Sequence, residues 1–323
     1  MSASEAKTAI LFPGQGLPLD PEAFRTFYDN DQSVRELVDS IDFRFDDGMS
    51  LRTLCLEGSE QLTDTRYVQA SLFLASMAVS LALEGAGIHA DAVAGLSLGE
   101  YAALCYAGSF DVQSGVTLMA SRGRIMAEAI PDGSGMASII GLDAEALESI
   151  CSEAQQYGAC QIATYSTDTR LVVTGDNKAV NSVIEQCAAR KRVQAVKLGT
   201  SRAFHSSLAR PAAELFASEI EKQNFVFKAP ELPVYYNVDG ETGHTGIGDI
   251  EVAQFYRPVQ LQKTIENMCR DGITRFIAIG PGVSLAAYAR ENAKALGLRA
   301  ETHVVEKYDD IATMLQKIEA ANA

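Results

Sequence analysis

The stretch Gly95-Leu96-Ser97-Leu98-Gly99-Glu100 carries a serine with a glycine two residues away on either side. An apolar run, Ala92-Val93-Ala94, precedes it, and a strong helix former, Tyr101-Ala102-Ala103-Leu104, follows it. This pattern predicts a strand, a sharp turn and a helix, with Ser97 at the apex of the turn. A turn this tight requires backbone angles and close chain approaches that a side chain would obstruct, and glycine permits both.

A G-x-S-x-G arrangement between a strand and a helix is typical of a nucleophile elbow, which lifts the serine hydroxyl clear of the sheet edge. The helix that follows would direct its free N–H groups and positive dipole end to the place where an oxyanion develops. The alternative is a Gly/Ser turn that fits the pattern by chance. Ser97 is therefore a candidate nucleophile.

Composition places the chain among ordinary globular proteins. Its 323 residues, 47% of them apolar, allow one large domain with or without a smaller insert. The first residues lack a basic region followed by an apolar one, so no secretory signal is expected. The apolar stretch Val68–Leu83 contains several polar residues, and we interpret it as a buried helix rather than a membrane span.

Cysteine usage indicates a reducing compartment. None of the six cysteines forms a C-x-x-C motif, which predicts reduced thiols, a cytoplasmic protein and no zinc site. They are Cys55, Cys105, Cys151, Cys160, Cys187 and Cys269.

The net charge of −15 favours solubility and argues against nucleic acid as a partner. One basic cluster, Arg190-Lys191-Arg192 with Lys197 and Arg202, departs from this balance. It is either a solvated surface cluster or a docking patch for an acidic partner, and charge alone leaves both open.

The predicted elements divide the chain into two domains. The apolar strand Thr8–Phe12 ends at Pro13-Gly14-Gln15-Gly16, and no dinucleotide or phosphate-binding glycine pattern follows. Residues 133–199 have the predicted order strand, helix, strand, strand, helix, strand, which is that of a ferredoxin-like unit. The predicted fold class is α/β. An α/β-hydrolase-like large domain with a parallel sheet and the nucleophile elbow (1–132 and 200–323) would carry an inserted ferredoxin-like (βαββαβ) small domain (133–199).

After the insert, we expect helices over about 207–224 and 258–269 and strands over 234–237 and 276–279.

A nucleophilic serine also requires a base, because its free hydroxyl is almost wholly protonated at neutral pH. His89, His244 and His303 fall in loops or an expected edge strand. His205 stands where the chain re-enters the large domain, and domain junctions are common sites for clefts. His205 is therefore the candidate base.

Six motifs, taken together and in order, resemble those of malonyl-CoA:acyl-carrier-protein transacylases, a family that includes free-standing fatty-acid-synthesis enzymes and polyketide synthase acyltransferases. The resemblance covers nearly the whole chain, including the small domain. The motifs are Phe12-Pro13-Gly14-Gln15-Gly16, Gly95-Leu96-Ser97-Leu98-Gly99-Glu100-Tyr101, Arg122-Gly123, Phe204-His205-Ser206, Pro258-Val259-Gln260 and Gly280-Pro281-Gly282.

The resemblance implies a role for each matching residue. Ser97 would carry the acyl group as an ester, and His205 would serve as base and then acid. The backbone carbonyl of Gln260 would orient His205 in place of an acidic residue. The amides of Gln15 and Leu98 would form the oxyanion hole, and Arg122 would pair bidentately with the malonyl carboxylate.

Substrate and partners follow from the same resemblance. Phe204, before the histidine, would favour malonyl over methylmalonyl, because its ring would clash with an extra methyl. The implied reaction is ping-pong transfer of malonyl from malonyl-CoA to acyl carrier protein, with no metal or redox cofactor, by a monomer. The acidic carrier protein would dock on Arg190, Lys191, Arg192 and Lys197.

The residues alone leave further functions open. A serine hydrolase or thioesterase would also use the nucleophile elbow, although a carboxylate clamp such as Arg122 would not serve a simple esterase. The chain could also be a carrier-protein binding module with a decayed site, or a trans-acting polyketide acyltransferase. Leu96 and Arg257 depart from the residues frequent in the family, as does the turn Tyr165–Arg170, and these departures bear on carrier-protein and pantetheine contacts.

Overall fold

The computed structural model describes residues 6–16, 18–200, 202–280 and 284–322. Within it the chain gathers into two compact units. The first unit comprises Met1–Gly123, Phe227–Tyr235 and Asn267–Ala323, and the second comprises Arg124–Val226 and Tyr236–Glu266. Two residues of the Gly280-Pro281-Gly282 motif, Pro281 and Gly282, lie outside the described residues.

The first unit is built on a parallel sheet with the strand order β7-β2-β1-β8-β9. Its strands span Lys7–Phe12 (β1), Ala92–Gly95 (β2), Val234–Tyr235 (β7), Ile273–Ile279 (β8) and Glu301–Val305 (β9). β2 and all of β1 after Lys7 are buried, as expected of strands in the interior of a parallel sheet. Because Phe12 pairs with Gly95, the loop after β1 and the nucleophile elbow leave the sheet at the same edge.

Helices surround this sheet. They are α1 (Pro21–Asn30), α2 (Gln32–Ser40), α3 (Leu51–Glu57), α4 (Thr65–Gly85), α5 (Leu98–Tyr106), α12 (Ser284–Ala295), α13 (Tyr308–Asn322) and the part of α6 (Val112–Ala129) up to Gly123, with a 3-10 turn at Glu60–Thr63. By length and composition α4 could cross a membrane, but 83% of its most apolar window is buried inside the protein. The prediction of a buried core helix is therefore confirmed.

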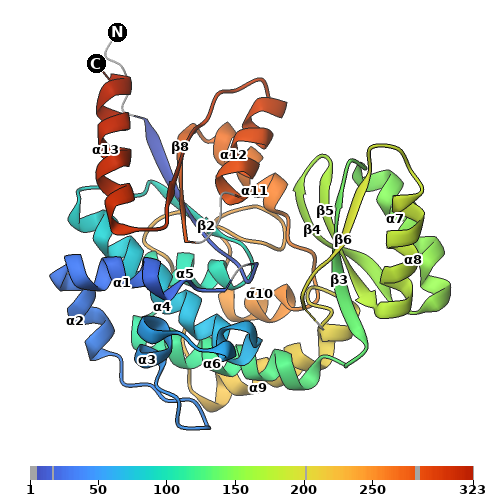
Figure 1. Cartoon of the computed structure of the whole chain (residues 1–323), viewed down its shortest axis with the longest axis horizontal. Helices are drawn as coiled ribbons and strands as arrows, with labels where there is room; N and C mark the ends of the chain where they lie inside the picture. Colours follow the sequence, from blue (N-terminus) through green and yellow to red (C-terminus); the bar gives the residue numbers. More distant parts are fainter. Residues whose placement is uncertain (1–5, 17, 201, 281–283, 323) are drawn as a thin grey trace. The chain divides into compact units, whose positions relative to one another are not determined.

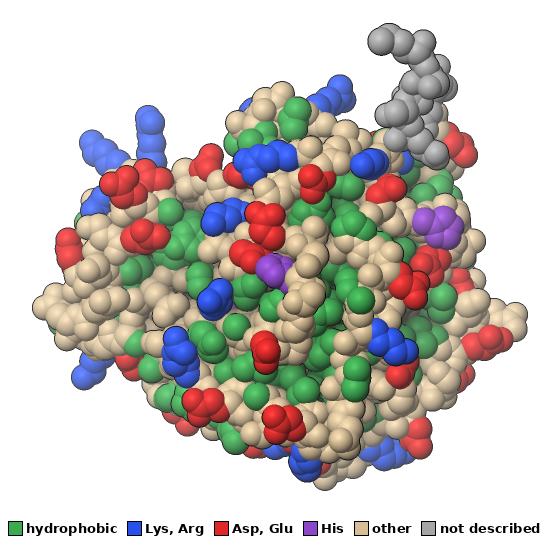
Figure 2. Space-filling model, turned by 180° about the vertical axis from the view of Figure 1, so that it is seen from behind, with side chains coloured by type: hydrophobic (Ala, Val, Ile, Leu, Met, Phe, Trp, Pro, Cys, Tyr) green, Lys and Arg blue, Asp and Glu red, His purple; other side chains and the backbone are tan. Residues whose placement is uncertain are grey.

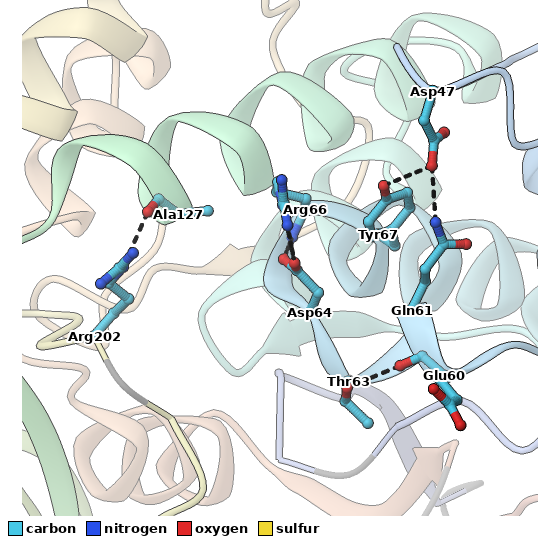
Figure 3. Close-up of polar contacts among 9 residues, drawn as sticks. All are labelled: Asp47, Glu60, Gln61, Thr63, Asp64, Arg66, Tyr67, Ala127 and Arg202. Atoms are coloured by element: carbon cyan, nitrogen blue, oxygen red, sulfur yellow. Dashed lines mark hydrogen bonds and ion pairs between the residues drawn. The ribbon is translucent and has the colours of Figure 1, made fainter. Parts of the chain in front are cut away.

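The N-terminus of α4 is fixed by side chains around it. The Asp64 carboxylate accepts hydrogen bonds from the Arg66 backbone N–H at 2.9 Å and from the Arg66 guanidinium, as expected of an N-cap residue. Asp47 accepts from the Tyr67 hydroxyl at 2.9 Å and from the Gln61 amide at 2.8 Å (Figure 3). These contacts fix the first turn of α4, which carries Thr65.

The second unit contains an antiparallel sheet with the strand order β4-β5-β3-β6. Its elements are β3 (Ser134–Ile140), α7 (Ala144–Ala154), a 3-10 turn (Gln155–Tyr157), β4 (Cys160–Thr167), β5 (Arg170–Asp176), α8 (Asn177–Ala188) and β6 (Gln194–Lys197). Figure 1 shows α7 and α8 on one face of the sheet, where a buried apolar core joins them to it. The predicted order of strands and helices is confirmed.

The second unit also includes α9 (Arg210–Lys222), preceded by a 3-10 turn (Ser207–Ala209), α10 (Ile247–Gln254) and the start of α11 (Leu261–Arg270). Val259 extends the sheet beside β4: its N–H donates to the Ala163 carbonyl at 2.8 Å, and its carbonyl accepts from the Tyr165 N–H at 2.9 Å. The expected helix over 258–269 thus begins later, at Leu261.

Helix α10 was not predicted from the sequence. Its buried residues are Ile247, Glu251 and Gln254, which share one helical face but include two polar side chains. The apolar period that signals a helix is therefore absent from its sequence.

Candidate active site

The nucleophile elbow has the predicted strand, turn and helix. β2 ends at Gly95, Ser97 has φ 54° and ψ −108°, and α5 begins at Leu98. A Cβ on Gly95 would lie 1.9 Å from the Gly99 carbonyl carbon, and one on Gly99 would lie 2.4 Å from the Phe12 carbonyl oxygen. The glycines are thus required for close approach, whereas the left-handed backbone angle falls on the serine itself, where strain typically marks a functional site.

The loop after β1 lies directly beside the nucleophile elbow. The Leu96 N–H donates to the Phe12 carbonyl at 3.0 Å, and a Cβ on Gly14 would lie 2.5 Å from the Leu96 carbonyl oxygen. Leu98 is the first residue of α5, so its N–H is among the helix-terminal amides that have no acceptor within the helix. Gln15 and Leu98, the two predicted oxyanion donors, therefore belong to adjoining backbone segments.

The Arg122 side chain reaches Ser97. One guanidinium nitrogen, Nη2, donates to Ser97 Oγ at 3.3 Å, and the other, Nη1, donates to Gln69 Oε1 at 2.6 Å. The guanidinium carbon lies 5.0 Å from the centre of the Tyr101 ring. With only 1% of its surface exposed, Arg122 is a fixed positive charge beside the serine hydroxyl.

A chain of side-chain hydrogen bonds connects Arg122 to the loop that carries Gln15. Gln69 Nε2 donates to Thr65 Oγ1 at 3.1 Å, and the Thr65 hydroxyl donates to Gln15 Oε1 at 2.6 Å. Thr65 and Gln69 were not predicted from the sequence. The sequence did contain an indication for Gln69, which is a polar residue in the mainly apolar stretch Val68–Leu83. In the structure Gln69 is only 1% exposed.

The candidate base, His205, lies in the second unit and also has a left-handed backbone, with φ 54°. Its Nδ1 lies 2.8 Å from the backbone carbonyl oxygen of Gln254, and the residue is only 4% exposed. A carbonyl can only accept, so Nδ1 carries the proton and Nε2 is left as the basic nitrogen.

The prediction that Gln260 orients the histidine was wrong. The Gln260 carbonyl accepts from the Thr264 N–H at 2.9 Å in the first turn of α11, whereas His205 Nδ1 contacts the Gln254 carbonyl. Gln254 is the last residue of α10, where carbonyls have no partner within the helix, and its carbonyl is therefore available to His205. The negative end of the α10 dipole also favours a positive charge on the imidazole.

Several hydrogen bonds position the chain around His205. The Gln161 side chain donates to the His205 carbonyl at 3.2 Å and accepts from the Ser207 N–H at 3.1 Å. Arg202 Nε donates to the Ala127 carbonyl at 3.0 Å (Figure 3), and the Arg202 guanidinium also pairs with Asp132. The histidine is thus fixed by contacts on both sides of it in the sequence.

The other three histidines lie in an exposed loop or pair with a carboxylate. His89 is exposed in a loop, His244 pairs with Asp239, and His303 pairs with Glu301 at 2.8 Å on the edge strand β9. In the described part of the chain, no group of three or more His, Cys, Asp or Glu side chains is placed to hold a metal ion.

The remaining predicted residues lie in the second unit. Phe204 is half-buried next to His205. The basic patch of Arg190, Lys191, Arg192 and Lys197 is exposed, and Val196 beside it is 58% exposed. Figure 2 shows one face of the protein, on which both basic and acidic side chains are exposed.

Comparisons with known proteins find relatives along nearly the whole chain. Residues 12–316 match the family model described as the acyl transferase domain. The malonyl CoA-acyl carrier protein transacylase of Bacillus subtilis is 32% identical over 322 residues, covering 98% of this chain and 99% of that protein. The Escherichia coli K12 protein of the same name is 36% identical over 248 residues, covering 75% of this chain and 80% of its own length.

Solved structures give the same result. The malonyl CoA-acyl carrier protein transacylase of Clostridium perfringens superposes with a TM-score of 0.89 at 28% identity, with 98% of each chain covered. A malonyl-transacylase solved in complex with its type II polyketide acyl-carrier protein gives a TM-score of 0.87 at 28% identity, covering 97% of this chain and 100% of that one.

Proposed function

The chain belongs to the acyl transferase domain family, and from this premise we propose that it is a malonyl-CoA:acyl carrier protein transacylase. One observation carries the choice of substrate: the buried Arg122 guanidinium lies 3.3 Å from Ser97 Oγ. A fixed cation at this distance matches an acyl group that bears a free carboxylate. A serine hydrolase acting on simple esters would gain nothing from it.

The reaction begins with acylation of Ser97. His205 Nε2 takes the hydroxyl proton as Oγ attacks the thioester carbonyl of malonyl-CoA. The amides of Leu98 and Gln15 stabilise the oxyanion, and each such donor is typically worth about 10²–10³-fold in rate. The C–S bond then breaks, and the imidazolium gives its proton to the CoA thiolate, leaving malonyl as an ester on Ser97.

The second half repeats these steps with the phosphopantetheine thiol of the carrier protein. His205 takes the thiol proton, the thiolate attacks the ester, and the proton returns to Ser97 Oγ as the C–O bond breaks. Through both halves the Gln254 carbonyl holds Nδ1–H and stabilises the imidazolium. No step requires a metal or redox cofactor.

Product analysis tests the function. The protein is mixed with radiolabelled malonyl-CoA and the phosphopantetheine form of acyl carrier protein, and the label is followed into carrier protein and free malonate. We expect nearly all of the label on the carrier-protein thiol. Release as free malonate with no transfer would instead identify a hydrolase.

The hydrogen bond between Gln69 and Arg122 provides the first prediction. Replacing Gln69 by alanine removes the acceptor of Nη1 and frees the guanidinium to turn away from the malonyl carboxylate. A hydrogen bond to a charged group is worth about 1.5–3 kcal/mol, so kcat/KM for malonyl-CoA should fall by about 10–100-fold. Ser80→Ala, on the same helix but outside this network, is the control. Equal activity of the two variants in steady-state assays would contradict the proposed role.

Phe204 sets the second prediction, which concerns selectivity. Phe204→Ala should increase the use of methylmalonyl-CoA relative to malonyl-CoA by about 10-fold or more, because one methyl group is typically worth about 1–3 kcal/mol of discrimination. Competition between the two thioesters, read by mass spectrometry, measures the ratio. An unchanged ratio would show that Phe204 does not contact the acyl group, and Tyr157→Ala serves as an exposed aromatic control.

The basic patch gives the third prediction. We propose that Arg190, Lys191, Arg192 and Lys197 dock the acidic carrier protein. The double variant Lys191→Glu/Lys197→Glu should raise KM for carrier protein about tenfold or more while leaving malonyl loading from CoA unchanged. The matched control reverses two exposed lysines of the first unit, Lys294 and Lys317. If both double variants have the wild-type KM, the patch does not dock the carrier.

We also infer the finer assignments that the family implies. The parallel sheet and the strand-turn-helix at Ser97 support an α/β-hydrolase-like domain over 1–132 and 200–323, and the strand order of the second unit supports a ferredoxin-like domain over 133–199. Six free buried cysteines support a cytoplasmic location.

The proposed pathway is fatty-acid synthesis, and the proposed oligomeric state is a monomer. The likeness to a type II polyketide transacylase favours polyketide synthesis as the second candidate.

A further inference from the structure

Three thiols meet in the core of the second unit. Cys151 lies on α7, Cys160 is the first residue of β4, and Cys187 lies on α8. Each is no more than 3% exposed, and all three are free. No step of malonyl transfer uses them.

Two of these cysteines lie beside the same open cavity. Cys151 and Cys160 belong to the same buried cluster, and both residues line an open cavity of about 270 Å³. Glu148, Gln155 and Tyr165 also line this cavity, whereas Cys187 does not. The cavity therefore offers a molecule of the size of hydrogen peroxide a route to the residues of this pair.

The two thiols differ in acidity. The hydrogen bond with Cys151 lowers the pKa of Cys160, and the same hydrogen bond, together with burial, raises the pKa of Cys151. A lowered pKa favours the thiolate, which is the form that reacts with oxidants, at Cys160.

Cys160 is adjacent to a residue that positions the candidate base. Its neighbour Gln161 binds both the His205 carbonyl and the Ser207 N–H. The Cys160 carbonyl itself accepts from Gln155 at 3.1 Å. A displacement at the start of β4 is thus transmitted through one side chain to the backbone of His205.

We propose that Cys151 and Cys160 are a reversible oxidation site that responds to hydroperoxides and forms a disulfide. The Cys160 thiolate attacks one peroxide oxygen, so that an S–O bond forms, the O–O bond breaks and hydroxide leaves and is protonated to water. The Cys151 sulfur then attacks the Cys160 sulfenic acid, so that the S–S bond forms, the S–O bond breaks and a second water leaves with the Cys151 proton. Two thiols are oxidised and one peroxide is reduced to two waters.

Disulfide formation should disturb His205. The two sulfurs must approach to about 2.05 Å, which draws the start of β4 toward α7 and moves Gln161 with it. His205 holds a left-handed backbone angle that its neighbours must maintain, so a loosened contact there should slow proton transfer. This consequence rests on the proposed function, in which His205 is the base, whereas the disulfide itself does not.

Peptide mapping after treatment with stoichiometric hydrogen peroxide tests the site without reference to activity. We expect Cys151- and Cys160-containing peptides to be linked in wild type and in Cys187→Ala, and separate in Cys151→Ala. Dithiothreitol should release the link. Linkage to Cys187, or sulfinic acid at Cys160 with no link, would overturn the proposal. Thermal unfolding of each variant confirms that it is folded.

Transfer activity tests the connection to His205. Oxidised wild type and Cys187→Ala should each lose at least about tenfold in malonyl transfer and regain it with dithiothreitol, while Cys151→Ala should keep its activity in peroxide. A disulfide that forms with no change in transfer would overturn the connection but not the site. If the reduced protein transfers no malonyl, the proposed function fails while the mapping result stands.

Discussion

Replacing Ser97 by alanine is expected to abolish the acyl-enzyme and to lower malonyl transfer by about 10⁴-fold or more, as removal of a nucleophile does when catalysis is covalent. Alanine lacks only the hydroxyl oxygen, and its Cβ imposes the same constraint on the positive φ at this position. The variant should therefore fold like the wild type, and the loss should appear in kcat. Steady-state transfer to carrier protein measures it.

The control for Ser97→Ala is Ser80→Ala, which removes a buried hydroxyl of α4 that donates to the Met77 carbonyl. That variant should retain nearly full activity. If Ser97→Ala instead retained more than about one hundredth of the wild-type rate, direct transfer between thiols or another nucleophile would have to replace the covalent mechanism.

Replacing Arg122 by alanine is expected to lower kcat/KM for malonyl-CoA by about 10²–10³-fold, because truncating one partner of a buried charge pair costs about 2–5 kcal/mol. The loss should be specific to acyl groups with a free carboxylate. Acetyl-CoA has none, so its loading should fall far less or increase relative to malonyl-CoA. Parallel loading assays with the two thioesters measure this ratio.

Arg122→Lys separates charge from shape. The guanidinium presents Nη1 to Gln69 and Nη2 toward the serine, and a lysine cannot reproduce this fork. We expect the lysine variant to load malonyl poorly as well. Equal losses for malonyl-CoA and acetyl-CoA in both variants would mean that Arg122 only supports the fold, and would remove the argument for a carboxylate substrate.

The nucleophile elbow could be predicted well because its chemistry depends on particular residue types at fixed spacing. Gly95 and Gly99 face backbone atoms that leave no room for a Cβ, so only glycine fits at either position. The central strand β1 was predicted for a similar reason, since a continuous apolar run is typical of a strand buried in a parallel sheet.

The error at Gln260 has a physical explanation. His205 is held by a backbone carbonyl, a group that every residue has. The sequence therefore does not reveal which residue provides the acceptor. The acceptor is also the end of α10, whose buried face carries Glu251 and Gln254 in place of apolar residues. Without that helix, the carbonyl that is available to His205 could not be located.

For Gln69 and Thr65, in contrast, the contacts are made by side chains, which the sequence does specify. Both are polar side chains whose hydrogen bonds connect Arg122 to Gln15; Thr65 is the first residue of α4, and Gln69 is one of several polar residues in its apolar stretch. A buried polar residue requires a partner, so such a residue indicates a contact, but the partner is distant in the sequence. The partner could be identified only from the packing of α4 against α6 and the loop after β1.

The position of the malonyl group on the enzyme tests the proposed function most directly. Wild type and the Arg122→Ala variant are mixed with malonyl-CoA in the absence of carrier protein, quenched in acid and digested, and the modified peptide is sequenced by mass spectrometry. We expect wild type to carry one malonyl ester on Ser97, which carrier protein discharges, and the variant to carry much less. A malonyl group on any other side chain, or an ester on Ser97 that forms equally well without Arg122, would contradict the central claim.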